Sequence, residues 1–151
     1  MVFFAARDIK AGEQLFYSYC SIEKSASQRK AELAPYGITQ CICAACVNAT
    51  PETDALRKTF NERVQEYRRQ RMIWQQLPRF PVEILDELLE FQRAVIAEGL
   101  DTDHIYWLNF LTTLTTAYEM VDRNDEASSV VEEMMRWHEF LTFRQAMESS
   151  Q

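Results

Sequence analysis

The sequence is poor in the residues that form turns. Its 151 residues include three glycines and four prolines, and no glycine occurs between Gly37 and Gly99. An all-β domain needs a turn about every ten residues, so this composition excludes that fold class and favours long helices. Hydrophobic residues make up 47% and charged residues 26%, which is globular composition and excludes a disordered or collagen-like chain.

Long apolar runs are also missing. No stretch approaches the roughly 18 consecutive apolar residues that a transmembrane helix requires. The opening segment, residues 1–6, is followed directly by Arg7 and Asp8, which makes it too short for a signal peptide. We therefore expect no membrane partner and a location in the cytoplasm, the nucleus or both.

Basic residues are too few for a surface that binds nucleic acid. The chain has 16 Lys and Arg against 23 Asp and Glu, which is a formal net charge of −7. The acidic excess lies in residues 51–151, which hold 11 basic and 19 acidic residues. Contacts to phosphates need clustered Lys and Arg, so we expect no direct binding of nucleic acid.

The first third of the chain, residues 1–47, predicts a small region that contains β-structure. Residues 2–6 form a short apolar run, and residues 15–19 form a second run that is rich in aromatic side chains. Both runs have the composition of strands. Gly12 lies between them, where a tight return of the chain can need a positive φ angle. A strand pair is the structure that this pattern favours.

Residues 48–151 predict a helical module. Thr50 is a suitable N-cap, because a proline follows it at the first helical position. Apolar residues, among them Ile96, Ile105 and Val131, recur at helical spacing, and short links make neighbouring helices antiparallel. With one short helix in the first region, the expected helices cover residues 27–33, 52–77, 82–98, 103–121 and 124–147. The predicted fold class is therefore α+β and predominantly α.

The most specific chemical signal is the C-x-C-x-x-C cluster formed by Cys41, Cys43 and Cys46. Three thiolates at this spacing can occupy three corners of a zinc tetrahedron, and they cannot all pair with one another as disulfides. A structural zinc site needs four ligands, so the fourth is either Cys20 or a group outside this chain. The sequence thus predicts a bound Zn²⁺ ion.

Four short motifs lead up to this cluster in order. They are the run from Arg7 to Leu15 (Arg-Asp-Ile-Lys-Ala-Gly-Glu-Gln-Leu), the run Tyr17-Ser18-Tyr19, residues 28–33, and Tyr36-Gly37-Ile38 with the cysteines. Together they resemble the end of a SET domain and its post-SET zinc motif, as found in the SET-domain protein-lysine methyltransferases. The resemblance covers about residues 2–47 and implies short SET-like strands. Residues 48–151 are similar to the helical, tetratricopeptide-like C-terminal region of the branch whose SET domain is interrupted by a MYND finger.

The resemblance implies roles for individual residues. Tyr19 matches the tyrosine beside the path of methyl transfer from S-adenosyl-L-methionine, where its phenol would position the amine of a substrate lysine. Tyr17 would line the substrate channel and keep the number of methyl groups low. Tyr36 and Ile38 would contact the cofactor, and the three cysteines would be the post-SET zinc ligands. The implied partner is a protein substrate such as a histone tail.

The motifs with which that family binds its cofactor are missing. The sequence has neither the earlier glycine-rich strand nor the Asn-His-x-Cys segment, whose Asn and His contact S-adenosyl-L-methionine and whose Cys is the fourth zinc ligand. We therefore expect the chain to be a C-terminal fragment of a methyltransferase that is inactive alone.

The helical module also suggests a different class of function. Paired helices can present a groove to a peptide, and the acidic excess of residues 51–151 would suit a basic partner such as a Lys-rich segment. The alternative is thus a non-catalytic, zinc-stabilised module for protein interaction. A methyltransferase needs further sequence to bind its cofactor, whereas such a module should fold and bind a partner with residues 41–151 alone.

Overall fold

The computed structural model describes residues 9–12, 19–102 and 104–148. Every regular element within these ranges is a helix, and none of their residues lies in a strand. The predicted α+β class is therefore wrong, because the described part of the chain is all-α. The expected strand at residues 2–6 and most of the one at 15–19 lie outside the described residues. Two short strands form a marginal pair by themselves, whereas a capped helix forms most of its backbone hydrogen bonds within one segment.

The first described region contains three short helical elements. They are α1 (Ala26–Leu33), the 3-10 helix η1 (Ala34–Tyr36) and α2 (Ala44–Val47). Ser25 is the N-cap of α1: its hydroxyl accepts a hydrogen bond from the Gln28 backbone, and the Gln28 side chain accepts one from the Ser25 backbone. Gly37 ends η1 with a φ of 75°, a left-handed conformation that favours glycine. This turn directs the chain into the cysteine cluster.

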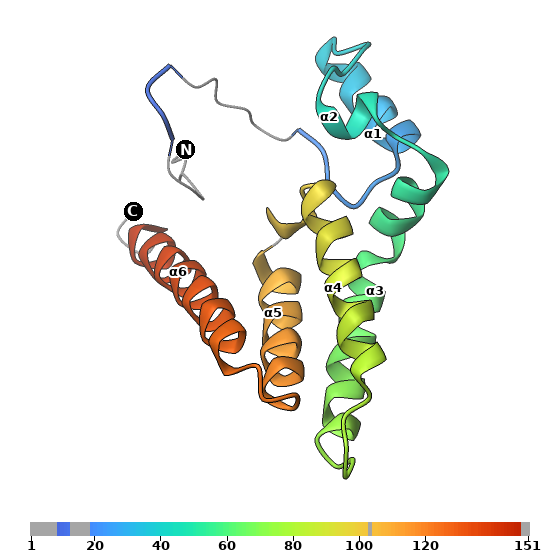
Figure 1. Ribbon diagram of the computed structural model, residues 1–151. Coiled ribbons are helices and arrows are strands. Elements are labelled where there is room, and N and C mark those ends of the chain that lie inside the picture. Colours follow the sequence, from blue (N-terminus) through green and yellow to red (C-terminus); the bar gives the residue numbers. More distant parts are fainter. Residues whose placement is uncertain (1–8, 13–18, 103, 149–151) are drawn as a thin grey trace.

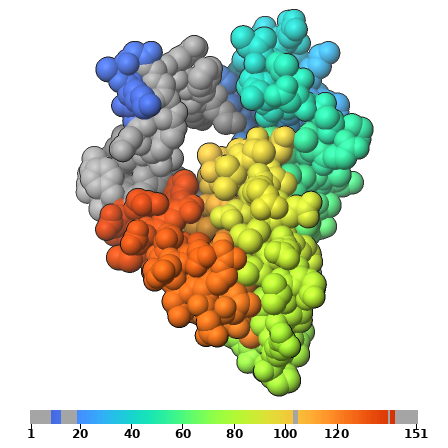
Figure 2. Space-filling model, in the orientation of Figure 1, coloured from blue at the N-terminus to red at the C-terminus, as the bar shows by residue number. Residues whose placement is uncertain are grey.

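The second region is a helical module whose helices lie close to the predicted boundaries. It consists of α3 (Pro51–Trp74), α4 (Val82–Ala97), the 3-10 helix η2 (Leu100–Thr102), α5 (His104–Glu119) and α6 (Asn124–Glu148). Figure 1 shows α3 and α4 as an antiparallel hairpin, with α5 lying between this hairpin and α6. In Figure 2 the turn between α3 and α4 forms the narrow end of the module. Among the described helices, none combines the length and apolar character of a bilayer span.

The core of the module is built from aromatic and aliphatic side chains of α3 to α6. Trp107 and Phe110 stack at 5.4 Å between ring centroids, and Phe91 meets Phe110 edge-on at 5.2 Å. From the first region, Ile22 packs against this core as a partly buried side chain. The fully buried members with the largest side chains are Trp107, Phe60, Phe110, Leu88, Leu100, Leu111, Leu114, Val64 and Val95.

A buried arginine attaches the first region to the module. The side chain of Arg57, in α3, is 2% exposed, and its guanidinium donates hydrogen bonds to three oxygens. These are the Ile22 carbonyl at 2.5 Å, the Glu98 carbonyl at 2.6 Å and the Glu98 carboxylate at 2.7 Å. The segment that precedes α1 is therefore held against α3 and the end of α4.

The N-cap of α3 provides a first test of the fold. Thr50 accepts a hydrogen bond from the Thr53 backbone, and the Thr53 hydroxyl accepts one from the Thr50 backbone. We expect Thr50→Ala to lower the free energy of unfolding by about 1 kcal/mol, because it leaves an N–H group of the first turn without its partner. Thr59→Ala is the matched control. Its hydroxyl donates to the Ala55 carbonyl within the helix, and alanine has the higher helix propensity. Urea unfolding followed by circular dichroism measures both, and equal losses would contradict the capping role.

Candidate metal centre

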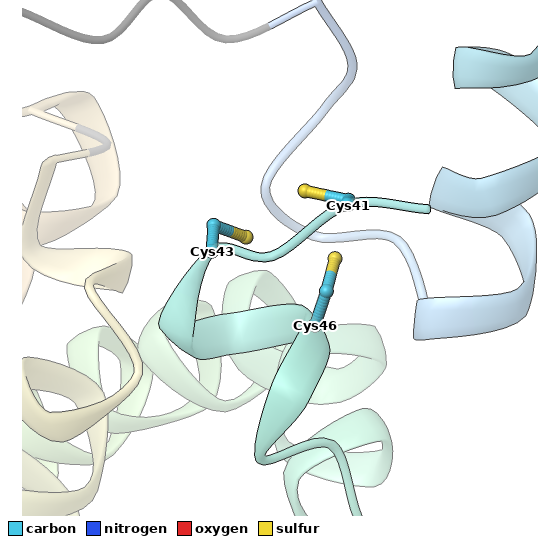
Figure 3. A group of neighbouring side chains, drawn as sticks. All are labelled: Cys41, Cys43 and Cys46. Atoms are coloured by element: carbon cyan, nitrogen blue, oxygen red, sulfur yellow. The ribbon is translucent and has the colours of Figure 1, made fainter. Parts of the chain in front are cut away.

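The three cysteines of the C-x-C-x-x-C motif converge on one point. Their Sγ atoms all lie within 4.8 Å of one another, and Figure 3 shows the three sulfurs facing a common space. Cys43 is the N-cap of α2 and Cys46 lies in its single turn, where its backbone N–H donates to the Cys43 carbonyl at 3.0 Å. Cys41 lies in the loop that leads into this turn. Local backbone structure therefore places two of the three thiols.

This spacing fits a tetrahedral metal site. Ligands at about 2.3 Å from a zinc ion lie about 3.8 Å from one another, so the sulfurs need to move by about 1 Å or less. Thiolate sulfur is a soft ligand that favours zinc over calcium or magnesium. The three cysteines can therefore hold a metal ion such as zinc, as the sequence predicts.

The thiols of Cys41 and Cys43 differ in acidity. A hydrogen bond from the Cys43 backbone is the main reason why the pKa of the Cys41 thiol lies below its usual value, and Arg29 lowers it further. The Cys43 residue is exposed as a whole, but its sulfur faces the other two. Loss of hydration there raises the pKa of the Cys43 thiol to about 11. Of these two thiols, Cys41 is the one that loses its proton first.

Alkylation of the metal-free chain tests this difference. At about pH 8, we expect iodoacetamide to modify Cys41 faster than Cys43, because the thiolate is the nucleophile. The Cys43 rate should rise only as the pH approaches the pKa of about 11. Accessibility alone predicts the opposite order, because Cys43 is exposed and Cys41 is only partly so. Peptide mass spectrometry after short exposures gives both rates, and faster labelling of Cys43 would contradict the assignment.

The buried side chain of Arg29 supports the cysteine loop through hydrogen bonds. Arg29, in α1, is 4% exposed. Its guanidinium donates to the carbonyl of Ala45, between Cys43 and Cys46, at 2.8 Å and also to the carbonyl of Lys24. A positive charge beside thiols favours their deprotonated, metal-binding form. Arg29 is not among the site residues expected from the sequence. Its position four residues before the buried Leu33, on the same face of α1, is the one signal that indicates its burial.

The two described tyrosines of the predicted site lie against each other. The ring centroids of Tyr19 and Tyr36 are 5.2 Å apart at an interplanar angle of 46°. Tyr36 closes η1 just before the cysteine loop, so the contact brings Tyr19 to the same end of the molecule. Both residues are exposed, Tyr19 to 52% and Tyr36 to 62%. An incoming ligand could therefore reach both side chains.

The other predicted site residues are placed less completely. Ile38 is half-buried, and its backbone N–H donates to the Leu33 carbonyl at 3.3 Å. Tyr17 lies outside the described residues. Cys20 is half-buried and follows Tyr19 directly.

In comparisons with known proteins, no family model matches this chain, and neither a curated protein nor a solved structure does.

Proposed function

We propose that this chain is the zinc-binding C-terminal part of a SET-domain protein-lysine methyltransferase. The observation that carries the proposal is the convergence of Cys41, Cys43 and Cys46, whose sulfurs lie within 4.8 Å of one another. In the family that the sequence resembles, this motif is the post-SET zinc site. The ring contact between Tyr19 and Tyr36 supports the proposal, because it joins the positioning tyrosine to the segment before the cysteines.

In this proposal each residue has a limited task. The three cysteines hold zinc, which when bound supplies a structural cross-link. The Tyr19 phenol accepts a hydrogen bond from the neutral amine of the substrate lysine and keeps the nitrogen aligned with the methyl group of S-adenosyl-L-methionine. Tyr36 and Ile38 contact the cofactor, and Tyr17 limits the space around the amine. The substrate class is a lysine in a protein.

The first test uses the chain as it stands. Because the Asn-His motif is missing from these 151 residues, we expect one zinc ion per chain by elemental mass spectrometry and no S-adenosyl-L-methionine binding by calorimetry. A chain that binds no zinc would contradict the proposal. Cofactor binding by this chain would contradict the requirement for the missing motif.

The second test restores the missing part. We expect a fusion that carries the cofactor-binding segment of a SET-domain methyltransferase before residue 1 to methylate lysine in a histone substrate. Tyr19→Phe in this fusion should lower kcat by about a hundredfold, because it removes one polar group that orients the reacting atoms. Tyr106→Phe, in the helical module, is the matched control and should leave the rate unchanged. Equal rates for both variants would exclude Tyr19 from the reaction.

A second candidate function is favoured by a hollow in the helical module. This hollow of about 340 Å³ lies where α5 ends and α6 begins, and its lining includes Glu119, Val131 and Glu132. Two carboxylates beside an apolar side chain suit a lysine, whose stem is apolar and whose head is positive. As a peptide-binding module, the chain should bind a Lys-rich peptide in fluorescence anisotropy, more weakly at high salt and after Glu119→Gln and Glu132→Gln. Peptide binding that is equally strong at high salt and after the two substitutions would exclude this site.

A further inference from the structure

Three thiolates leave one position of a tetrahedral zinc site open. Structural zinc sites in proteins are four-coordinate, usually with cysteine and histidine ligands. The sequence contains four cysteines, and Cys20 is the one outside the C-x-C-x-x-C motif. Cys20 is half-buried although it lies in a bend of the segment that precedes α1. Its place in the fold therefore decides whether it can complete the site.

The backbone on both sides of Cys20 is fixed beside the cysteine loop. Before it, the Tyr19 ring rests on the Tyr36 ring at 5.2 Å. After it, the Lys24 carbonyl accepts a hydrogen bond from the Arg29 guanidinium, which also binds the Ala45 carbonyl in α2 at 2.8 Å. One buried side chain thus ties the segment of Cys20 and the turn of Cys43 and Cys46 together. In the view of Figure 3 the chain before α1 crosses the loop that carries Cys41.

Electrostatic effects agree with this placement. Burial is the main cause that raises the pKa of the Cys20 thiol, and the charges of Cys46 and Cys41 raise it further, whereas Arg29 lowers it. Charges influence one another in this way only at short range, since water and salt screen distant pairs. Among the described residues, however, the group whose ligand atoms are close enough to hold one metal ion comprises Cys41, Cys43 and Cys46, so the Cys20 sulfur must move toward them to join the site.

We propose that Cys20 is the fourth zinc ligand and that zinc binding joins its thiolate to those of Cys41, Cys43 and Cys46. Each thiol releases its proton as its sulfur binds the metal. A site of four thiolates and one Zn²⁺ carries two negative charges, and the buried guanidinium of Arg29 offsets one of them. This inference rests on the proposed zinc site, and it assigns to Cys20 the place that the Cys of the missing Asn-His-x-Cys segment has in the family that the sequence resembles.

A metal bond to Cys20 would also affect the neighbouring Tyr19. Cys20 and Tyr19 are adjacent, so a metal bond to Cys20 would restrict the backbone of Tyr19 and hold its ring against Tyr36. Zinc would then order the residue that we expect to position the substrate amine. A site completed by a water molecule or by another polypeptide would give Tyr19 no metal-bound neighbour and leave its ring contact with Tyr36 to hold it.

Cobalt substitution tests the ligand assignment in the chain of 151 residues. Co²⁺ occupies zinc sites, and its sulfur-to-metal charge-transfer absorption increases with the number of thiolates. We expect Cys20→Ser to lower this absorption by about one quarter and to weaken zinc binding by at least about tenfold in chelator competition. Cys41→Ser should act in the same way, and Thr39→Ala, an exposed change close to the cluster, should have no effect.

The possible outcomes separate this proposal from the proposed function. If Cys20→Ser matches the parent chain in cobalt absorption and zinc affinity while Cys41→Ser does not, the zinc site stands and Cys20 is not a ligand. If the parent chain binds neither metal, both proposals fail. If Cys20→Ser lowers both readouts and the chain keeps its helical circular dichroism, the loss reflects a missing ligand and not a misfolded chain.

Discussion

Replacement of Glu98 by alanine is expected to lower the free energy of unfolding by about 3 to 5 kcal/mol. The side chain of Arg57 is 2% exposed and that of Glu98 is 13% exposed, so water does little to screen their ion pair. Without the carboxylate, the charge of Arg57 stays buried with the carbonyl oxygens of Ile22 and Glu98 as acceptors. These neutral groups satisfy N–H donors but do not neutralise the charge, which is the physical origin of the large effect.

An exposed ion pair of the same module is the matched control. Arg69 and Glu66 lie 2.6 Å apart, but their side chains are 69% and 48% exposed. Glu66→Ala should therefore change the stability little, because solvent screens such pairs. Urea unfolding at about pH 7 measures both variants. A loss for Glu98→Ala as small as that for Glu66→Ala would show that the pair does not carry a buried charge.

A double variant separates the cost of the unpaired charge from the loss of packing. Arg57→Met with Glu98→Met removes both charges and keeps similar side-chain volumes. We expect this chain to be more stable than Glu98→Ala, because replacement of a whole buried pair by apolar groups is often close to neutral. The double variant should also remove the hydrogen bond from Arg57 to the Ile22 carbonyl. Faster hydrogen exchange of the backbone amides in residues 19–24 would show this loss.

Two separate arginines, Arg57 and Arg29, hold the segment before α1 in place, although this segment has no regular structure. Arg57 binds the carbonyl of Ile22 from the helical module, and Arg29 binds the carbonyl of Lys24 from α1. Both arginines are buried, and both join segments that are distant in sequence. Tyr19 and Cys20 lie just before the two carbonyls that these arginines bind. The position of the candidate site therefore depends on side chains that contribute no chemistry to it.

The sequence predicts the helical module well because its signals are local. Thr50 and Pro51 mark the start of α3, and both the N-cap and the proline position are confirmed. The predicted end at residue 77 is too late, because α3 stops at Trp74. Pro78 accounts for the difference, since a proline disfavours helical geometry in the residue before it. Capping and periodicity thus indicate where helices lie to within about a turn.

Long-range packing explains what the sequence could not predict. Ile96, Ile105 and Val131 lie on the apolar stripes but are 50%, 62% and 39% exposed, because no described helix covers these edges of the stripes. Spacing along one helix shows which face is apolar and not how much of it a neighbour covers. The burial of Arg57 depends in the same way on an acceptor 41 residues away. The three cysteines, in contrast, were predictable because six residues contain the whole cluster.

Loss of one cysteine ligand is the second large effect that we expect. Cys46→Ser should weaken zinc binding by more than about a hundredfold, since changes in outer-shell partners alone cost ten- to a hundredfold. The amides of Cys46, Val47 and Asn48, which donate to carbonyls of Cys43 and Ala44, should then lose protection in hydrogen exchange. Removal of zinc by a chelator should have the same result in the parent chain. Val47→Ala, at a side chain that is 67% exposed, is the control and should change neither readout.

The same experiment should leave the helical module intact. Its core is formed by buried residues of α3 to α6, such as Phe60, Trp107 and Leu114, and among the described residues none of the core members comes from the cysteine loop. Exchange of the Phe60 amide should therefore stay slow while the α2 turn opens, because separate regions of a protein can unfold with different free energies. Loss of protection in both regions would mean that zinc stabilises the whole chain. Loss in α2 alone would limit the role of the metal to the end of the molecule that holds Tyr19 and Tyr36.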